Sequence, residues 1–203
     1  MTAPGPPAVE VTGIVLAGGR SERFGSDKLA LAIDGRPLLH LAIAAVAAVA
    51  GRLVVVVAPG AEPALPGDLA SRIDVVHDPE AFGGPLVGLA AALVALDTPT
   101  VLVAGGDMPR MVPAVLARLA VAVGGSRRAA TLEVPGRVQP LPMALDVVAA
   151  RAAAASVLAR GGRSLRDLLL ELGAAAIPAP VWLALDPSGA TIVDIDRPVD
   201  LGS

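Results

Sequence analysis

The chain has 203 residues and a mass of 20.1 kDa, and 54% of its residues are hydrophobic whereas only 1% are aromatic. This length is typical of one domain with a substantial core, which must be built here from small aliphatic side chains. A net charge of −3 argues against a general nucleic-acid-binding protein, and the lack of cysteine excludes disulfides, thiolate metal sites and cysteine nucleophiles.

The sequence also bears on where the chain folds and works. The longest apolar stretches, residues 37–51 and 83–96, are shorter than the ~20 residues that a membrane span needs, so we expect no membrane segment. No Lys or Arg precedes Arg20, which argues against a signal peptide. We therefore expect a cytoplasmic protein, with a disordered tail over residues 1–11 and a single domain over residues 12–203.

The first predicted element is an apolar strand over residues 12–17, which runs into a glycine-rich turn with Gly18, Gly19, Arg23 and Lys28. Glycines let backbone N–H groups approach phosphate oxygens, and the two cations can donate charge-assisted hydrogen bonds to a polyanion. The turn fits neither the ATPase phosphate loop nor the dinucleotide fingerprint. It predicts a binding loop for a nucleoside triphosphate.

The elements that follow alternate between β-branched runs and alanine-rich stretches with helical spacing. This alternation predicts a three-layer, Rossmann-like α/β sandwich with a mostly parallel central sheet. In the second half, Ser164 and Asp167 resemble a capping box at the start of a helix that Gly173 closes. Further strands are expected at residues 53–58, 73–77, 100–104 and 129–133, and an extended segment around residues 139–144. Helices are expected at residues 39–50, 86–96, 112–123 and 147–158.

Two carboxylates follow predicted strands, at the edge of the sheet where ligands bind in such folds. Asp107 comes after strand 100–104 and can hold Mg²⁺, which keeps waters and substrate phosphate oxygens as its other ligands. Its alternative role is to cap the helix that begins near Val112. Asp78 follows strand 73–77 at the same edge, where it could contact a ligand. Its alternative role is to form a turn with Pro79.

Two further segments carry candidate polar groups. Gly84 and Pro85 open a helix whose free N–H groups and positive dipole end would suit an anionic acceptor group. Near the end of the chain, residues 192–201 alternate so that Asp194 and Asp196 share one side of a short predicted strand. One or both of these aspartates are then candidates to face the metal.

The turn after the first strand reads Leu16-Ala17-Gly18-Gly19-Arg20-Ser21-Glu22-Arg23-Phe24-Gly25-Ser26-Asp27-Lys28. It resembles the N-terminal signature of nucleotidyltransferases of the molybdenum cofactor guanylyltransferase (MobA) family. Later segments resemble that family less specifically, namely Gly84-Pro85-Leu86-Val87-Gly88, Gln139-Pro140-Leu141 and Arg163-Ser164-Leu165. The resemblance spans roughly residues 13–201, and it implies a fold of the nucleotide-diphospho-sugar transferase type.

The resemblance also implies a reaction: transfer of GMP from GTP to the terminal phosphate of molybdopterin or molybdenum cofactor, with Mg²⁺ as cofactor and pyrophosphate as leaving group. Lys28, Arg23 and Asp107 would be catalytic, with Asp107 as metal ligand and Asp196 as a second candidate. The GTP-binding residues would be Leu16, Ala17, Gly18, Gly19, Lys28, Asp78 and Asp107. The acceptor residues would be Gly84, Pro85, Arg137 and Gln139. Transient contact with molybdoenzymes or their chaperones stays open.

Two departures from the family pattern bear on which nucleotide base, guanine or cytosine, the enzyme selects. Better known guanylyl members have an asparagine near the base where this chain has Val57, and asparagines where it has Asp194 and Asp196. The aspartates resemble cytidylyl-transferring relatives, whereas Gly18-Gly19 resembles the guanylyl pattern. A cytidylyltransferase acting on molybdopterin, a nucleotidyltransferase for another phosphorylated acceptor and a noncatalytic nucleotide or cofactor carrier therefore remain as alternatives.

Overall fold

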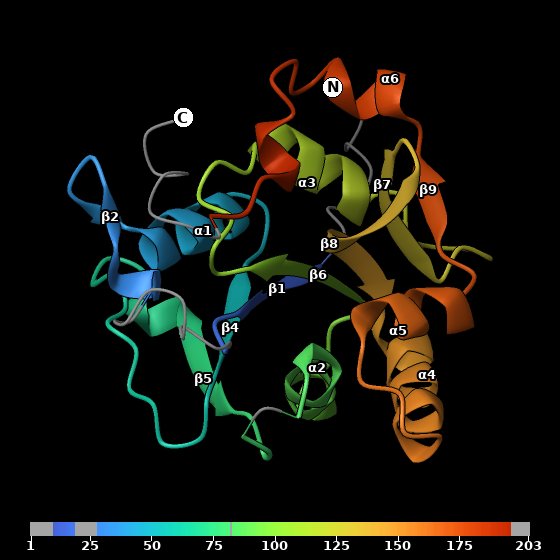
Figure 1. Ribbon diagram of the computed structural model, residues 1–203, viewed down its shortest axis with the longest axis horizontal. Helices are drawn as coiled ribbons and strands as arrows, with labels where there is room; N and C mark the ends of the chain where they lie inside the picture. Colours follow the sequence, from blue (N-terminus) through green and yellow to red (C-terminus); the bar gives the residue numbers. More distant parts are fainter. Residues whose placement is uncertain (1–9, 19–27, 82, 196–203) are drawn as a thin grey trace, which may run out of the picture.

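A central sheet organises the computed structural model, which describes residues 10–18, 28–81 and 83–195. Among these residues the sheet has seven strands in the order β5-β4-β1-β6-β8-β7-β9 (Figure 1). Every strand runs parallel to β1 except β8, which is antiparallel to both β6 and β7. The strands are β1 (Val11–Leu16), β4 (Arg52–Val57), β5 (Ile73–His77), β6 (Thr100–Gly105), β7 (Ala129–Val134), β8 (Arg137–Asp146) and β9 (Ala175–Ile177).

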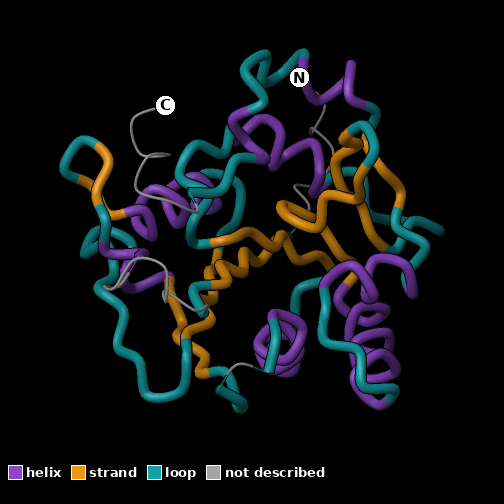
Figure 2. The backbone as a smooth tube through the Cα atoms, in the orientation of Figure 1, coloured by secondary structure: helices purple, strands orange, loops and turns teal. Residues whose placement is uncertain are grey.

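Helices cover both faces of the sheet, so that the molecule has three layers (Figure 2). On one face lie α1 (Leu38–Ala47), α3 (Pro113–Ala120) and α6 (Ala179–Leu183), packed in one apolar cluster with β1, β4 and β6. On the other face α2, α4 and α5 form the second cluster with the same strands. Their bounds are Pro85–Val94, Val147–Ala159 and Leu165–Glu171, and short 3-10 helices span Lys28–Ala30, Ala70–Arg72 and Ala190–Ile192.

The layers approach each other closely because glycines lie at their contacts. A Cβ atom on Gly13 of β1 would overlap Val46 of α1, and one on Gly88 of α2 would come 2.8 Å from Cγ1 of Val56. Such contacts let helices pack on the sheet without large side chains between them. This arrangement is how a chain with almost no aromatic residues fills its core.

Apart from the strand expected over residues 192–201, the predicted strands and helices are present, with bounds that differ by a few residues. Strand 73–77 has the expected bounds, and β1 begins at Val11, so the strand includes the last residue of the expected tail. Residues 1–9 lie outside the described part of the chain. The prediction missed β9, α6 and a small hairpin of β2 (Ala32–Ile33) and β3 (Arg36–Pro37).

The strand predicted over residues 192–201 is wrong within the described residues. Ile192 ends a 3-10 turn, and residues 193–195 pair with no strand there. The backbone N–H of Ile195 donates instead to the carbonyl of Asp107, at 2.9 Å. Alternation in the sequence identified an extended segment, but this segment lies against a loop and not at a sheet edge. No helix in residues 10–18, 28–81 and 83–195 is long and apolar enough to cross a membrane.

Candidate functional site

The candidate site lies where the strand order reverses. The chain passes from β1 to β4 and β5 on one side and then returns to β6 on the other side of β1. The carboxyl ends of β1 and β6 thus adjoin, and in open α/β sheets ligands bind at such switch points. The N–H of Gly106 donates to the carbonyl of Leu16 at 2.9 Å, which joins the two strand ends directly.

The predicted nucleotide loop begins at this edge. Leu16 ends β1, and the N–H of Ala17 donates to the carbonyl of Val56 on β4 at 2.7 Å. Gly18 lies beside the end of β4, where an added Cβ would make ordinary contact at 3.6 Å from the N atom of Ala58. Gly19 and Arg23 lie outside the described residues. The described part of the loop therefore places its backbone at the switch point.

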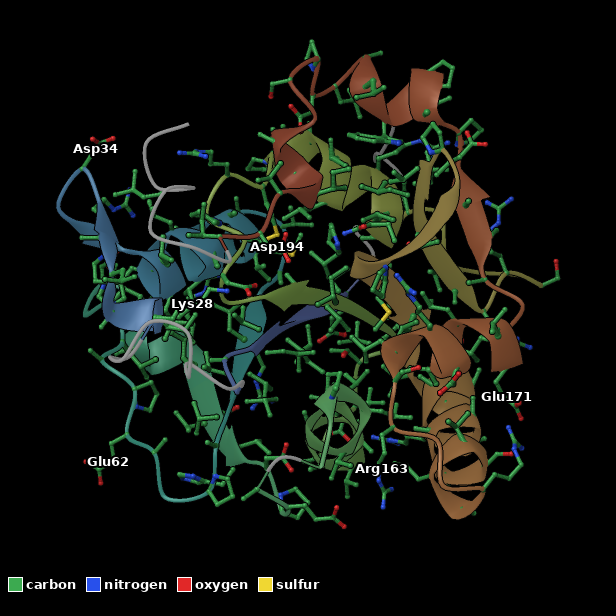
Figure 3. All side chains as sticks on the ribbon, viewed as in Figure 1. Lys28, Asp34, Glu62, Arg163, Glu171 and Asp194 are labelled. Atoms are coloured by element: carbon green, nitrogen blue, oxygen red, sulfur yellow. The ribbon has the colours of Figure 1, made fainter. Side chains whose placement is uncertain are left out.

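Lys28 and Asp107 meet at this edge, although they are 79 residues apart in sequence. The Lys28 Nζ atom lies 3.0 Å from Oδ2 of Asp107, and the two side chains are only 13% and 31% exposed. Figure 3 shows Lys28 beside the tip of the β6 arrow. A Cβ on Gly105 would come 2.6 Å from Oδ1 of Asp107, so the glycine leaves room for the carboxylate beside the strand end.

Asp107 does not cap the helix that follows it, which removes that alternative. The N-cap residue of α3 is Val112, and no side-chain hydrogen bond caps the helix. The N–H of Val112 itself donates to Oγ1 of Thr191, at 3.0 Å. The Asp107 carboxylate is thus directed to Lys28 and not to the backbone of α3.

The donor set at Asp107 suits a metal ion that arrives with its substrate. In the described part of the chain, no group of at least three His, Cys, Asp or Glu side chains could hold a metal ion. Mg²⁺ is commonly held by one or two carboxylates together with substrate phosphates and waters, which a single aspartate fits. Asp196, the second candidate ligand, lies outside the described residues.

Asp78 lies two strands away from β1, at the same edge of the sheet. Its Oδ1 accepts a hydrogen bond from the N–H of Glu80 at 3.0 Å, so the expected turn is formed. Its Oδ2 points at α2, because a Cβ on Gly88 would come within 3.1 Å of that atom. The structure thus gives Asp78 a local role in the turn, alongside the nucleotide contact that the resemblance implies.

The amino end of α2 differs from its prediction. Gly84 takes the positive φ of 93° before Pro85, but the N–H of Leu86 donates to the carbonyl of Arg163, at 3.3 Å. The N–H of Val87 donates to Gly84, at 3.1 Å. The expectation of free N–H groups is therefore wrong at Leu86, because the loop between α4 and α5 lies against this helix end, and at Val87, whose N–H is used within the first turn. A Cβ on Gly84 would come 2.9 Å from the Arg163 oxygen.

The other two predicted acceptor residues lie at the start of β8. Because β8 is antiparallel to β6, its first residues lie toward the carboxyl ends of the parallel strands. Arg137 pairs with Val134 in the hairpin of β7 and β8. The Gln139 side chain donates from Nε2 to the carbonyl of Leu141, at 2.7 Å, so part of its hydrogen-bonding capacity is used within its own strand.

Sequence reasoning missed a polar cluster near the end of the chain. Asp186 is 2% exposed, and its carboxylate accepts hydrogen bonds from Oγ of Ser188 and the N–H of Thr191 at 2.6 and 2.7 Å. Burial raises the pKa of the Asp186 carboxyl, but these hydrogen bonds outweigh burial and hold that pKa below the usual aspartate value. The turn-forming run Asp186-Pro187-Ser188-Gly189 was the available signal.

The comparison with known families decides which class of site this is. The model of the MobA-like NTP transferase domain matches residues 13–176. The chain belongs to this family. A probable molybdenum cofactor guanylyltransferase from Chloroflexus aggregans is 35% identical over 197 residues, which cover 94% of this chain and 91% of that protein.

Solved structures share the fold of this MobA-like chain. Molybdopterin-guanine dinucleotide biosynthesis protein A from Archaeoglobus fulgidus superposes with a TM-score of 0.72 at 22% identity, covering 94% of this chain and 95% of that one. 2-C-methyl-D-erythritol 4-phosphate cytidylyltransferase from Thermus thermophilus superposes with a TM-score of 0.66 at 23% identity, covering 93% and 94%. The predicted family, fold class and nucleotidyltransferase activity are confirmed, whereas the fold by itself does not select the base.

Proposed function

We propose that this nucleotidyltransferase transfers GMP from GTP to the terminal phosphate of molybdopterin or molybdenum cofactor. Pyrophosphate leaves, and the product is a guanine dinucleotide cofactor. The observation that carries the proposal is the ion pair of Lys28 and Asp107 at the switch point of a MobA-like fold. The name of the Chloroflexus aggregans relative supports the guanylyl group and the molybdenum cofactor as acceptor.

The proposed mechanism uses position and charge, with no covalent enzyme intermediate. The acceptor phosphate attacks the α-phosphorus of GTP in line, while negative charge builds on the departing pyrophosphate. Lys28 would neutralise that charge together with Arg23, which lies outside the described residues. Asp107 would hold Mg²⁺, which when bound polarises the α-phosphate. Leu16, Ala17, Gly18, Gly19 and Asp78 would line the nucleotide.

The Lys28–Asp107 pair indicates how the free enzyme balances its charges. The ammonium group lies 3.0 Å from the carboxylate, so each group partly satisfies the other before substrate binds. A triphosphate offers Lys28 several anionic oxygens in place of one carboxylate, which would leave Asp107 available to a cation. Nucleotide and Mg²⁺ would then bind together.

The acceptor would lie toward β8 and the amino end of α2. Arg137 and Gln139 support this position because both lie in the first residues of β8. Because the N–H of Leu86 already donates to the Arg163 carbonyl, it would not bind the acceptor. Gly84 and Pro85 would then bound the acceptor position on the side of α2 by their shape. We further propose that the enzyme works in the cytoplasm and contacts molybdoenzymes or their chaperones transiently when the product is handed over.

Product analysis tests the proposal. The purified protein is incubated with Mg²⁺, molybdopterin and either GTP or CTP, pyrophosphate release is followed, and the dinucleotide is identified by mass. We expect a guanine dinucleotide and a strong preference for GTP. The matched control is Asp107→Asn, which keeps the side-chain shape and should abolish Mg²⁺-dependent pyrophosphate release while the fold stays intact.

The outcomes separate the alternatives. A cytosine dinucleotide would replace the guanylyl assignment with the cytidylyl one, and turnover only with another phosphorylated acceptor would overturn the molybdopterin assignment. Nucleotide binding without any turnover would favour a carrier. Wild-type turnover in Asp107→Asn would remove Asp107 from the metal site.

A further inference from the structure

The loop that carries Asp107 is held at both ends by one distant segment. At the first end, the Asp107 carbonyl accepts a hydrogen bond from the N–H of Ile195, at 2.9 Å. At the second end, the N–H of Val112 donates to Oγ1 of Thr191, at 3.0 Å. Thr191 and Ile195 are both fully buried. We call residues 186–195 the C-terminal strap, and Figure 3 shows Asp194 of this strap near the end of β6.

The strap has internal bonds that keep its two contacts in a fixed relation. The Asp186 carboxylate accepts from Ser188 and from the N–H of Thr191, so the backbone of Thr191 is tied to a buried group. The N–H of Gly189, which has φ of 69°, donates to the Asp186 carbonyl at 3.0 Å. Within the described residues, no buried side-chain nitrogen or oxygen lacks a hydrogen-bond partner.

The strap is also anchored to the sheet. The N–H of Asp186 donates to the carbonyl of Trp182 at 3.1 Å, and Trp182 is 3% exposed. The indole Nε1 of Trp182 in turn donates to the carbonyl of Glu133 on β7, at 3.0 Å. A continuous path of hydrogen bonds therefore runs from β7 to the Asp107 loop.

At the far end of this loop, the side chain of Val112 makes no hydrogen bond that caps α3. Val112 stands at the N-cap position of α3, where a Ser, Thr, Asp or Asn side chain usually accepts a backbone hydrogen bond. Thr191, from elsewhere in the chain, instead accepts from the N–H of Val112 itself and so holds the backbone of the loop at this end. Met108 and Met111 pack into the core at 2% and 5% exposure, but flexible thioether side chains specify position weakly.

We propose that the C-terminal strap sets the position of the Asp107 carboxylate, with Thr191 and Asp186 as positioning residues. The inference rests on the proposed function, because it takes Asp107 as the metal ligand. A ligand carboxylate depends on the bonds that orient it, since small displacements weaken coordination. Without the Thr191 hydrogen bond, the loop would keep its apolar contacts but sample a wider range of positions.

The test is Thr191→Val, which removes the hydroxyl and preserves the shape of the side chain. Hydrogen exchange of the peptide over residues 105–116 reports on the loop in the nucleotide-free protein. Mn²⁺ affinity in the presence of α,β-methylene-GTP, followed by electron paramagnetic resonance, reports on the metal site without turnover. We expect faster exchange in that peptide and Mn²⁺ binding weakened by roughly tenfold, as for other residues that orient metal ligands.

Two matched variants separate positioning from general destabilisation. Thr191→Ser keeps the hydroxyl and should restore both readouts. Thr98→Val removes a comparable threonine hydrogen bond, from Thr98 Oγ1 to Thr12 Oγ1 at 2.9 Å, at the opposite edge of the sheet. It should leave exchange of the loop and Mn²⁺ affinity unchanged. Should Thr191→Val fail to fold, Asp186→Asn gives the second test, with a change in the same direction.

The results distinguish this inference from the proposed function. Faster exchange with unchanged Mn²⁺ affinity would overturn the positioning role, because the strap would then be only structural. Unchanged exchange in Thr191→Val would overturn the strap itself. A wild-type protein that binds no Mn²⁺ with the nucleotide analogue and releases no pyrophosphate would instead overturn the metal site at Asp107, whatever the exchange data show.

Discussion

Replacing Lys28 with methionine should have opposite effects on metal binding and on catalysis. Methionine has a similar length but no charge, so Lys28→Met removes the ammonium group that lies 3.0 Å from Oδ2 of Asp107. In nucleotide-free protein the carboxylate would then be available to a divalent cation. During turnover the same change removes a charge that stabilises the leaving pyrophosphate.

The size of the first effect follows from the geometry. Two unit charges at the observed 3.0 Å attract by about 1.4 kcal/mol even at the dielectric constant of bulk water. The side chains are only 13% and 31% exposed, which raises the attraction. A competing cation is therefore expected to bind nucleotide-free Lys28→Met about tenfold more tightly than wild type, since about 1.4 kcal/mol is a factor of ten. Pyrophosphate release from GTP should fall by about a hundredfold or more.

Titration of nucleotide-free protein with Mn²⁺ measures the first effect, and a pyrophosphate assay measures the second. Lys28→Arg keeps the cation and should bind Mn²⁺ as wild type does. In Lys28→Met combined with Asp107→Asn the gain in affinity should vanish. Unchanged or weaker Mn²⁺ binding in Lys28→Met would refute the reasoning, because Lys28 would then not compete with cations for Asp107 in solution.

Further expectations concern the Asp107 loop and its strap. Gly105→Ala should lower pyrophosphate release while the protein still folds, because the new Cβ would lie 2.6 Å from Oδ1 of Asp107 and displace the carboxylate; wild-type kinetics would show that the loop adapts. Asp186→Asn should lower the free energy of unfolding by about 2 kcal/mol near neutral pH, since hydrogen bonds to a charged acceptor are lost. The pKa of Asp186 is lowered in the folded state. The stability that its carboxylate contributes is therefore complete above the unfolded pKa of about 3.9, and it is lost as pH falls through the folded pKa. Urea unfolding should therefore show the difference between wild type and variant shrinking below about pH 4, and a difference independent of pH would contradict this.

Much of the fold could be read from local patterns, because these report what each segment must bury. The β-branched run Ile73–His77 formed a strand with the expected bounds. The Ser164 side chain accepts from the N–H of Asp167 at 3.1 Å, and Gly173 takes a positive φ of 57°. The position of Asp107 beside the loop that follows β1 was also foreseeable, because parallel strands that alternate with helices bring their carboxyl ends to one edge. Its ion pair with Lys28 was not predicted.

The tertiary structure alone decided which polar groups found partners. Alternation over residues 192–195 could not distinguish a strand from an extended segment, since that choice depends on whether a free edge lies within reach. Helix propensity could not reveal that Arg163 would take the N–H of Leu86, nor that Thr191 would take that of Val112. The contact of Val112 joins segments 79 residues apart, and such hydrogen bonds exist only once the packing of the layers has brought the two backbones together.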